Sequence, residues 1–279
     1  MDTKDQEHRL AGAIEKFNRS KEIFDDLRGE MDTFFNGTPR PYSSLGGFDE
    51  IRWEWVERFQ VHGRPPLRFG VLLGDCVHNL RSALDHAIWQ TTLLDGGTTD
   101  RATQFPIASK SEQQFERMAK TQIRGLSAEH RALVKSVQPY NHETGASAHP
   151  LAVLADLSNT DKHQLVHTTY SFMGEDADAI LDALVGNSQG PGPSPVDSFW
   201  VAKYGSRLDH GEPWLRIAWS RDQPPPEKVA LTGNLELGVA FGAFGLDAED
   251  FKEIARTVLA IIETFMRDFP ETRFVEPEL

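Results

Sequence analysis

The chain has 279 residues, of which 39% are hydrophobic, 10% are aromatic and 25% are charged, and this composition excludes wholesale disorder. The formal net charge of −13 disfavours broad binding to phosphate backbones, which depends on many Lys and Arg contacts, but it allows a local nucleic-acid site. The single cysteine, Cys76, excludes an intramolecular disulfide and a cysteine-based zinc cluster.

Targeting and cofactor signals are missing from the sequence. Residues 1–7 lack the basic start and apolar stretch of a signal peptide, and no run of 18 apolar residues occurs. We therefore expect a cytoplasmic protein that makes no contact with a membrane. Neither a phosphate-binding loop of the Gly-x4-Gly-Lys-Ser/Thr type nor a dinucleotide fingerprint is found, so no cofactor is expected.

The N-terminal segment predicts a helix over about residues 5–34. Leu10, Phe17, Phe24 and Met31 lie seven residues apart and form one apolar seam along it. Such a seam packs against another helix of the same chain or against a second copy of the chain. The second alternative predicts a homodimer.

Helices dominate the chain as far as residue 158. A turn-rich connection at 37–47 and a strand at 51–59 precede a long helix at 67–94, which ends before an Asp-Gly-Gly breaker. Three shorter helices are predicted after it, at 111–119, at 127–137 with Ser127 as its cap, and at 149–158.

The pattern then changes to short strands separated by turn formers. Strands are predicted at 166–172, 199–202, 214–219 and 235–241. A strongly amphipathic helix at 248–269 closes the chain, with Asp247 as its expected cap.

These elements indicate an α+β fold in which long packed helices accompany a mainly antiparallel sheet and a C-terminal amphipathic helix. We expect residues 1–279 to form a single domain, helix-rich over 1–158, sheet-rich over 159–245 and closed by a helix over 246–270. The strand at 51–59 needs partners, so we expect it to join the later strands in one sheet.

The long helix carries an unusual polar face. A solvated face usually uses Lys, Glu, Arg and Gln, but no Lys or Glu occurs from Asp75 to Gln90. This composition is typical of a buried polar network or a site. Short polar residues occupy the face instead: Asp75, His78, Asn79, Ser82, Asp85 and His86.

A second polar segment runs from 156 to 167 and contains Asp161, Lys162 and His163. Either Asp161 caps a new helical turn, or a helix after Asp161 places His163 and His167 one turn apart. Buried polar groups need partners, so we expect the two polar segments to meet. In particular, Asp85 or His86 should lie within hydrogen-bonding reach of Asp161, Lys162 or His163.

The sequence from Arg81 to His86 resembles the Arg-x4–6-His motif of the HEPN superfamily, helical proteins that include metal-independent ribonucleases and toxin components. The resemblance implies that Arg81 stabilises phosphate charge and that His86 transfers protons at a dimer interface. The segments LRSALDH and Asp161-Lys162-His163, with Phe105-Pro106-Ile107 and Gln138-Pro139-Tyr140, are also similar to a group of bacterial proteins. That second resemblance implies no activity.

Three functions remain open from the sequence. The first is a non-catalytic binding or structural protein with a buried polar cluster, in which His78, Asn79, Asp161 and Lys162 are the binding residues and the small-molecule ligand is unknown. The second is a HEPN-like ribonuclease. The third is a metal-dependent hydrolase. The catalytic candidates of the second are Arg81, Asp85, His86 and His163, and those of the third are Asp75, His78 and His163.

Overall fold

The computed structural model describes residues 10–143, 145–163, 168–172, 196–203, 206–224, 237–241 and 248–267. The chain divides into two compact units. The helical unit comprises residues 1–28, 70–166 and 248–279, and the β unit comprises residues 29–69 and 167–247. The fold class is α+β, as the sequence predicted. That the two units behave as one domain stays a prediction.

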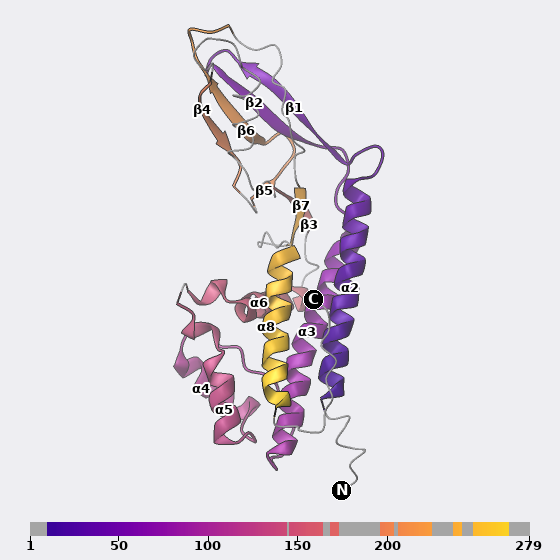
Figure 1. The fold of residues 1–279 in the computed structure, drawn as a ribbon, viewed down its shortest axis with the longest axis vertical. Coiled ribbons are helices and arrows are strands. Elements are labelled where there is room, and N and C mark those ends of the chain that lie inside the picture. The colour runs from indigo at the N-terminus through magenta and orange to yellow at the C-terminus, as the bar shows by residue number, and fades with distance from the viewer. Residues whose placement is uncertain are drawn as a thin grey trace. The chain divides into compact units, whose positions relative to one another are not determined.

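Three helices form the core of the helical unit: α2 (Ala11–Phe35), α3 (Leu67–Leu94) and α8 (Ala248–Met266). Figure 1 shows them running side by side. The predicted bounds of α3 are confirmed. Leu10, Phe17 and Phe24 of the N-terminal seam are buried inside this unit, and the Phe24 ring stacks on Phe251 of α8 at 3.9 Å between centroids. The seam therefore packs within its own chain. It no longer supports the prediction of a homodimer.

Shorter helices complete the unit: α4 (Glu112–Gln122), α5 (Ala128–Ser136), the 3-10 turns η1 (Pro139–Asn141) and η2 (Ala146–Ala148), and α6 (Pro150–His163). Ser127 caps α5 as expected, because its Oγ accepts a hydrogen bond from the His130 amide. The prediction that Asp161 caps a new turn is wrong. Asp161 lies inside α6, which continues past the predicted end at residue 158 because no Gly or Pro interrupts it before His163.

The β unit contains two antiparallel sheets. The larger sheet has the order β1 (Tyr42–Asp49), β2 (Glu54–Val61), β6 (Pro213–Trp219), β4 (Val196–Val201). The smaller has the order β5 (Arg207–Leu208), β3 (Thr168–Phe172), β7 (Leu237–Phe241). The predicted strand at 51–59 does join a later strand, because β2 pairs with β6. The expectation of one sheet is wrong, and so is the turn-rich connection at 37–47, most of which belongs to β1.

A buried carboxylate explains why β1 contains a glycine at position 46. Glu57 of β2 is only 6% exposed, and it accepts hydrogen bonds from the Ser44 hydroxyl and from the Trp55 indole. Trp214 donates in turn to the Ser44 hydroxyl at 2.9 Å. A Cβ on Gly46 would lie 2.2 Å from Glu57 Oε1, so only glycine leaves room for this network.

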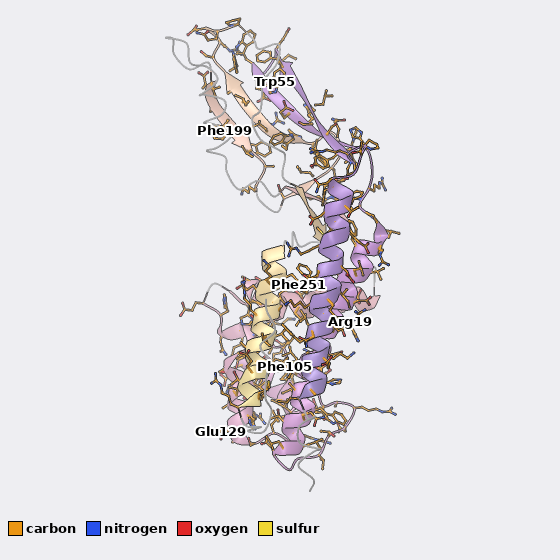
Figure 2. All side chains as sticks on the ribbon, turned by 45° about the vertical axis from the view of Figure 1, so that its right-hand side comes forward. Arg19, Trp55, Phe105, Glu129, Phe199 and Phe251 are labelled. Atoms are coloured by element: carbon orange, nitrogen blue, oxygen red, sulfur yellow. The ribbon has the colours of Figure 1, made fainter. Side chains whose placement is uncertain are left out.

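The tryptophans are distributed unevenly between the units. Of the six in the chain, Trp89 alone belongs to the helical unit. The other five belong to the β unit: Trp53, Trp55, Trp200, Trp214 and Trp219. Figure 2 labels Trp55 and Phe199 in the β unit and Phe105 and Phe251 in the helical unit.

Among the described helices, none combines the length and apolar character that a membrane span requires.

Candidate functional site

One set of polar residues on α3 holds a neighbouring backbone segment. The Phe105 amide donates to Asp85 Oδ1 at 2.8 Å, and Arg81 Nη2 donates to the Phe105 carbonyl. Arg81 and Asp85 also form an ion pair at 3.0 Å. Burial lowers the pKa of the Arg81 guanidinium, and the neighbouring Asp85 carboxylate opposes that shift. Both side chains are thus engaged by each other and by the backbone of Phe105.

Gln138 holds the same segment from the other side. Its side chain is almost fully buried, and its amide donates to the carbonyls of Pro106 and Val134 at 3.0 and 2.8 Å. Its Oε1 accepts from the Ala108 amide at 2.8 Å. We term Arg81, Asp85 and Gln138 the clamp, because together they fix residues 105–108. In the sequence, Gln138 was noted only within the Gln138-Pro139-Tyr140 segment and was not expected to hold the fold.

A buried histidine was also missed. His130 of α5 is 7% exposed, and its Nδ1 lies 2.9 Å from both carboxylate oxygens of Asp95, just beyond the end of α3. The Ser127 amide donates to the same carboxylate at 2.7 Å. This arrangement ties the end of α3 to the first turn of α5. A histidine three residues after a capping serine was the only signal for it in the sequence.

An adjoining face of α3 carries exposed side chains from Val71 to Leu93. Val71, Trp89 and Leu93 are 49%, 38% and 43% exposed, and they are the only exposed large apolar side chains among the described residues of the helical unit. Polar residues without Lys, Arg or Glu lie between them. At 100° per residue all these positions fall within an arc of about 80°. We term this set the stripe: Val71, Asp75, His78, Ser82, His86, Trp89 and Leu93.

A cavity of about 280 Å³ opens beside one end of the stripe. It is lined by Asp85, His86, Trp89, Gln90 and Thr103. The His86 ring also lies against α2, since a Cβ on Gly12 would be 3.0 Å from its Nδ1. Arg81 does not line this cavity. The two residues of the predicted Arg-x4–6-His motif are therefore separated, one in the clamp and the other at the cavity.

One residue of the second polar segment, Asp161, reaches α3 just before the polar face that begins at Asp75, and not at the predicted place. The Asp161 carboxylate lies against α3 at Gly74, where a Cβ would be 2.1 Å from Oδ1. Eleven residues, or about 16 Å along a helix axis, separate Gly74 from Asp85. The expected contact of Asp161 with Asp85 or His86 is therefore wrong. The helix α6 reaches α3 about two to three turns closer to its start than the motif does.

The remaining predicted residues have different environments. Asn79 is 9% exposed and its side chain donates to the Asp75 carbonyl one turn earlier, so it is occupied within α3. His78 is exposed on the stripe. The side chains of Lys162 and His163, and all of His167, lie outside the described residues. Within the described part of the chain, no group of three or more His, Cys, Asp or Glu residues is arranged to hold a metal ion.

Comparisons with known proteins do not assign the chain to a family. No protein-family model, no curated protein and no solved structure gives a significant match to the chain.

Proposed function

We propose that this protein is a non-catalytic binding protein that forms a homodimer through the stripe of α3, and that the clamp has a structural role. The observation that carries the proposal is the concentration of exposed apolar side chains of the helical unit on one stripe. Exposed apolar residues that line up on one face of a helix favour an interaction site there. Arg81 and Asp85, by contrast, already serve the backbone of Phe105.

The stripe has a symmetry that favours a second copy of the chain as its partner. Its members lie at equal distances in sequence on either side of Ser82. A two-fold axis through Ser82, perpendicular to α3, would bring each residue opposite its counterpart. Val71 would then face the partner's Leu93, His78 would face the partner's His86, and Asp75 would face the partner's Trp89, whose indole can donate to a carboxylate.

The area of the stripe predicts a weak dimer. From Val71 to Leu93 the helix is about 33 Å long, and a helix with its side chains is about 10 Å wide. The product, about 330 Å² per partner, is less than half of the roughly 800 Å² that a standard interface buries on each side. We therefore expect a dissociation constant in the micromolar range.

Analytical ultracentrifugation from about 1 to 100 µM tests the association. Trp89→Glu places a carboxylate opposite Asp75 of the partner in this arrangement, and we expect it to raise the dissociation constant at least tenfold. The matched control is Ile51→Glu, because Ile51 is 91% exposed in the β unit and should leave association unchanged. A wild-type protein that stays monomeric at 100 µM would overturn the dimer.

Cysteine cross-linking tests the antiparallel arrangement. Ser82→Cys should form a disulfide-linked dimer on mild oxidation, whereas His78→Cys alone should not, because its two copies would be about 12 Å apart. A mixture of His78→Cys and His86→Cys proteins should cross-link. The native Cys76 does not interfere, since burial raises the pKa of its thiol and keeps it unreactive. Ser136→Cys, at the end of α5, is the control. Self-linking of His78→Cys would indicate a parallel pair instead.

A HEPN-like ribonuclease is the second candidate, and the cavity beside His86 and Asp85 favours it. Purified protein should be incubated with RNA in the presence of a chelator, with His86→Ala alongside and an elemental analysis of the protein as isolated. The binding proposal expects no cleavage. Chelator-resistant cleavage that is lost in His86→Ala would select the nuclease, and stoichiometric metal would select the hydrolase.

A further inference from the structure

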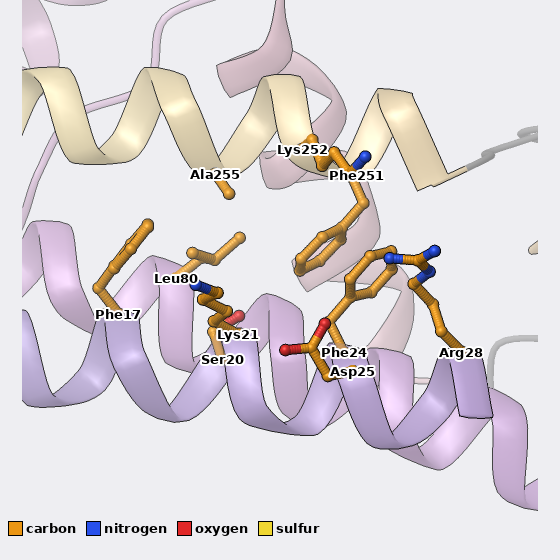
Figure 3. Close-up of a pocket in the computed structure, with 10 residues that line it drawn as sticks. All are labelled: Phe17, Ser20, Lys21, Phe24, Asp25, Arg28, Leu80, Phe251, Lys252 and Ala255. Atoms are coloured by element: carbon orange, nitrogen blue, oxygen red, sulfur yellow. The ribbon is translucent and has the colours of Figure 1, made fainter. Parts of the chain in front are cut away.

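A small apolar hollow lies between α2, α3 and α8 in the helical unit (Figure 3). Its volume is about 70 Å³. Phe17 forms one wall and the stacked rings of Phe24 and Phe251 form the other. Leu80 and Ala255 lie between these walls, and the short Ala255 side chain leaves the space open. Nothing in the proposed dimer uses this hollow, because none of its residues belongs to the stripe.

The mouth of the hollow is mainly cationic, although the chain as a whole has a net charge of −13. Lys21, Arg28 and Lys252 line it together with one acid, Asp25. Among the described residues, neither Lys21 nor Arg28 has an ion-pair partner, even though Asp25 lies four and three residues away on the same helix. Figure 3 shows Lys21 near the middle of the hollow and Arg28 beside the Phe24 ring.

The polar group in the wall of the hollow is already satisfied. The Ser20 hydroxyl is fully buried and donates to the Cys76 carbonyl at 2.9 Å. The interior therefore offers only apolar contact, and polar recognition is left to the side chains at the mouth. An apolar interior with a few polar groups at one end is the usual design of a small-molecule site.

From this geometry we infer that the hollow binds a small amphipathic carboxylate, a monoanion with a short aliphatic tail. The tail lies between Phe17 and the stacked pair, and the carboxylate reaches Lys21 and Arg28. A water molecule needs about 10–15 Å³ and a cavity of about 150 Å³ accepts benzene, so about 70 Å³ suits a short chain. Asp25 lowers the positive potential at the mouth, which favours one negative charge over a phosphate dianion.

Titration calorimetry with three probes of equal length tests both halves of the inference. Sodium hexanoate should bind the full-length protein saturably, hexan-1-ol more weakly, and hexylamine not at all, because only the carboxylate combines the tail with the correct charge. Equal binding of hexylamine and hexanoate would overturn the assignment of charge. The absence of hexanoate binding up to 10 mM would overturn the site.

Variants locate the binding. Lys21→Gln combined with Arg28→Gln should weaken hexanoate binding about tenfold and leave hexan-1-ol unchanged. Ala255→Leu should fill the hollow and abolish binding of both, with far-UV circular dichroism confirming that the variant is folded. Arg256→Gln, the exposed neighbour of Ala255 that does not line the hollow, is the matched control. Undiminished binding to the folded Ala255→Leu protein, or to the double variant, would place the ligand elsewhere.

Discussion

Helix α3 presents two sets of polar residues that differ in how their hydrogen-bonding groups are satisfied. Arg81 and Asp85 of the clamp bond to the backbone of Phe105 and to each other. The polar members of the stripe, His78 and His86 among them, are open to solvent and lie between exposed apolar side chains. Both sets belong to the same unusual polar run between Asp75 and Gln90. Short polar residues on a helix therefore indicate that the face has a hydrogen-bonding partner. They do not indicate whether that partner is the chain's own backbone or another molecule.

The clamp and the stripe should respond oppositely to substitution. A variant in the clamp should lower the free energy of unfolding and leave the association of the folded protein intact. A variant in the stripe should weaken association and leave folding intact. The following experiments test this contrast, beginning with the largest expected effect.

Gln138→Leu should lower the free energy of unfolding by about 3 kcal/mol, measured by urea denaturation. The substitution leaves the Ala108 amide and the Pro106 and Val134 carbonyls without their buried partner, and an unmet buried group costs about 1–3 kcal/mol. The control is Gln113→Leu on the exposed side of α4, where we expect a change below about 0.5 kcal/mol. Similar stabilities for the two variants would show that the clamp does not hold the fold.

Ser82→Asp should weaken dimerisation by about 2 kcal/mol, or roughly 30-fold in the dissociation constant. It places two carboxylates opposite each other on the proposed two-fold axis. Sedimentation at low and high salt measures the effect, which salt should reduce. Ser136→Asp on α5 provides the control. If the two variants associate equally well, the axis does not pass through Ser82.

Arg81→Lys should lower the free energy of unfolding by about 1 kcal/mol. Lysine keeps the charge that balances Asp85, but its ammonium cannot reproduce the planar fork that reaches both Asp85 and the Phe105 carbonyl. Arg101→Lys, at an exposed position, is the control. Thermal denaturation of both proteins gives the comparison, and an unchanged melting temperature for Arg81→Lys would remove Arg81 from the clamp.

The smallest effect concerns His149, which accepts a hydrogen bond from the Leu151 amide at the start of α6. Burial and the nearby His142 lower the pKa of His149, while Glu253 opposes the shift. The unfolded chain therefore takes up the proton first, so the stability of the fold should decrease as the pH falls below about 6.5. His149→Asn keeps the capping acceptor without titrating. Its stability should fall less than that of the wild type between pH 7 and 5, and identical pH profiles would contradict the prediction.

The sequence predicted the helices well because their signals are local. The bounds of α3 follow from a continuous apolar arc and an Asp-Gly-Gly end, and Ser127 marks the start of α5. Strand β1 was missed for a reason that lies elsewhere in the chain. Gly46 and Gly47 resemble a turn, but Gly46 is needed because the Trp55 and Glu57 side chains of the next strand cover it.

The candidate site was predicted less well because the role of its residues depends on backbone partners and on exposure, neither of which a sequence pattern shows. Arg81 and Asp85 were selected correctly as unusual, but their partner is the backbone of Phe105, which leaves no trace in side-chain composition. Val71 and Leu93 were not associated with the polar face, because that face was recognised only between Asp75 and Gln90. Their exposure became apparent only when the helix was placed among its neighbours.

The uneven distribution of tryptophans gives the two units separate spectroscopic signals. Five of the six indoles belong to the β unit, while α2, α3 and α8 contribute most of the helical backbone. Intrinsic fluorescence should therefore report mainly on the β unit, and circular dichroism at 222 nm should report mainly on the helices. In a Trp89→Phe protein all tryptophan fluorescence comes from the β unit. Coincident unfolding curves from the two signals would then indicate one cooperative domain, and displaced curves would indicate two.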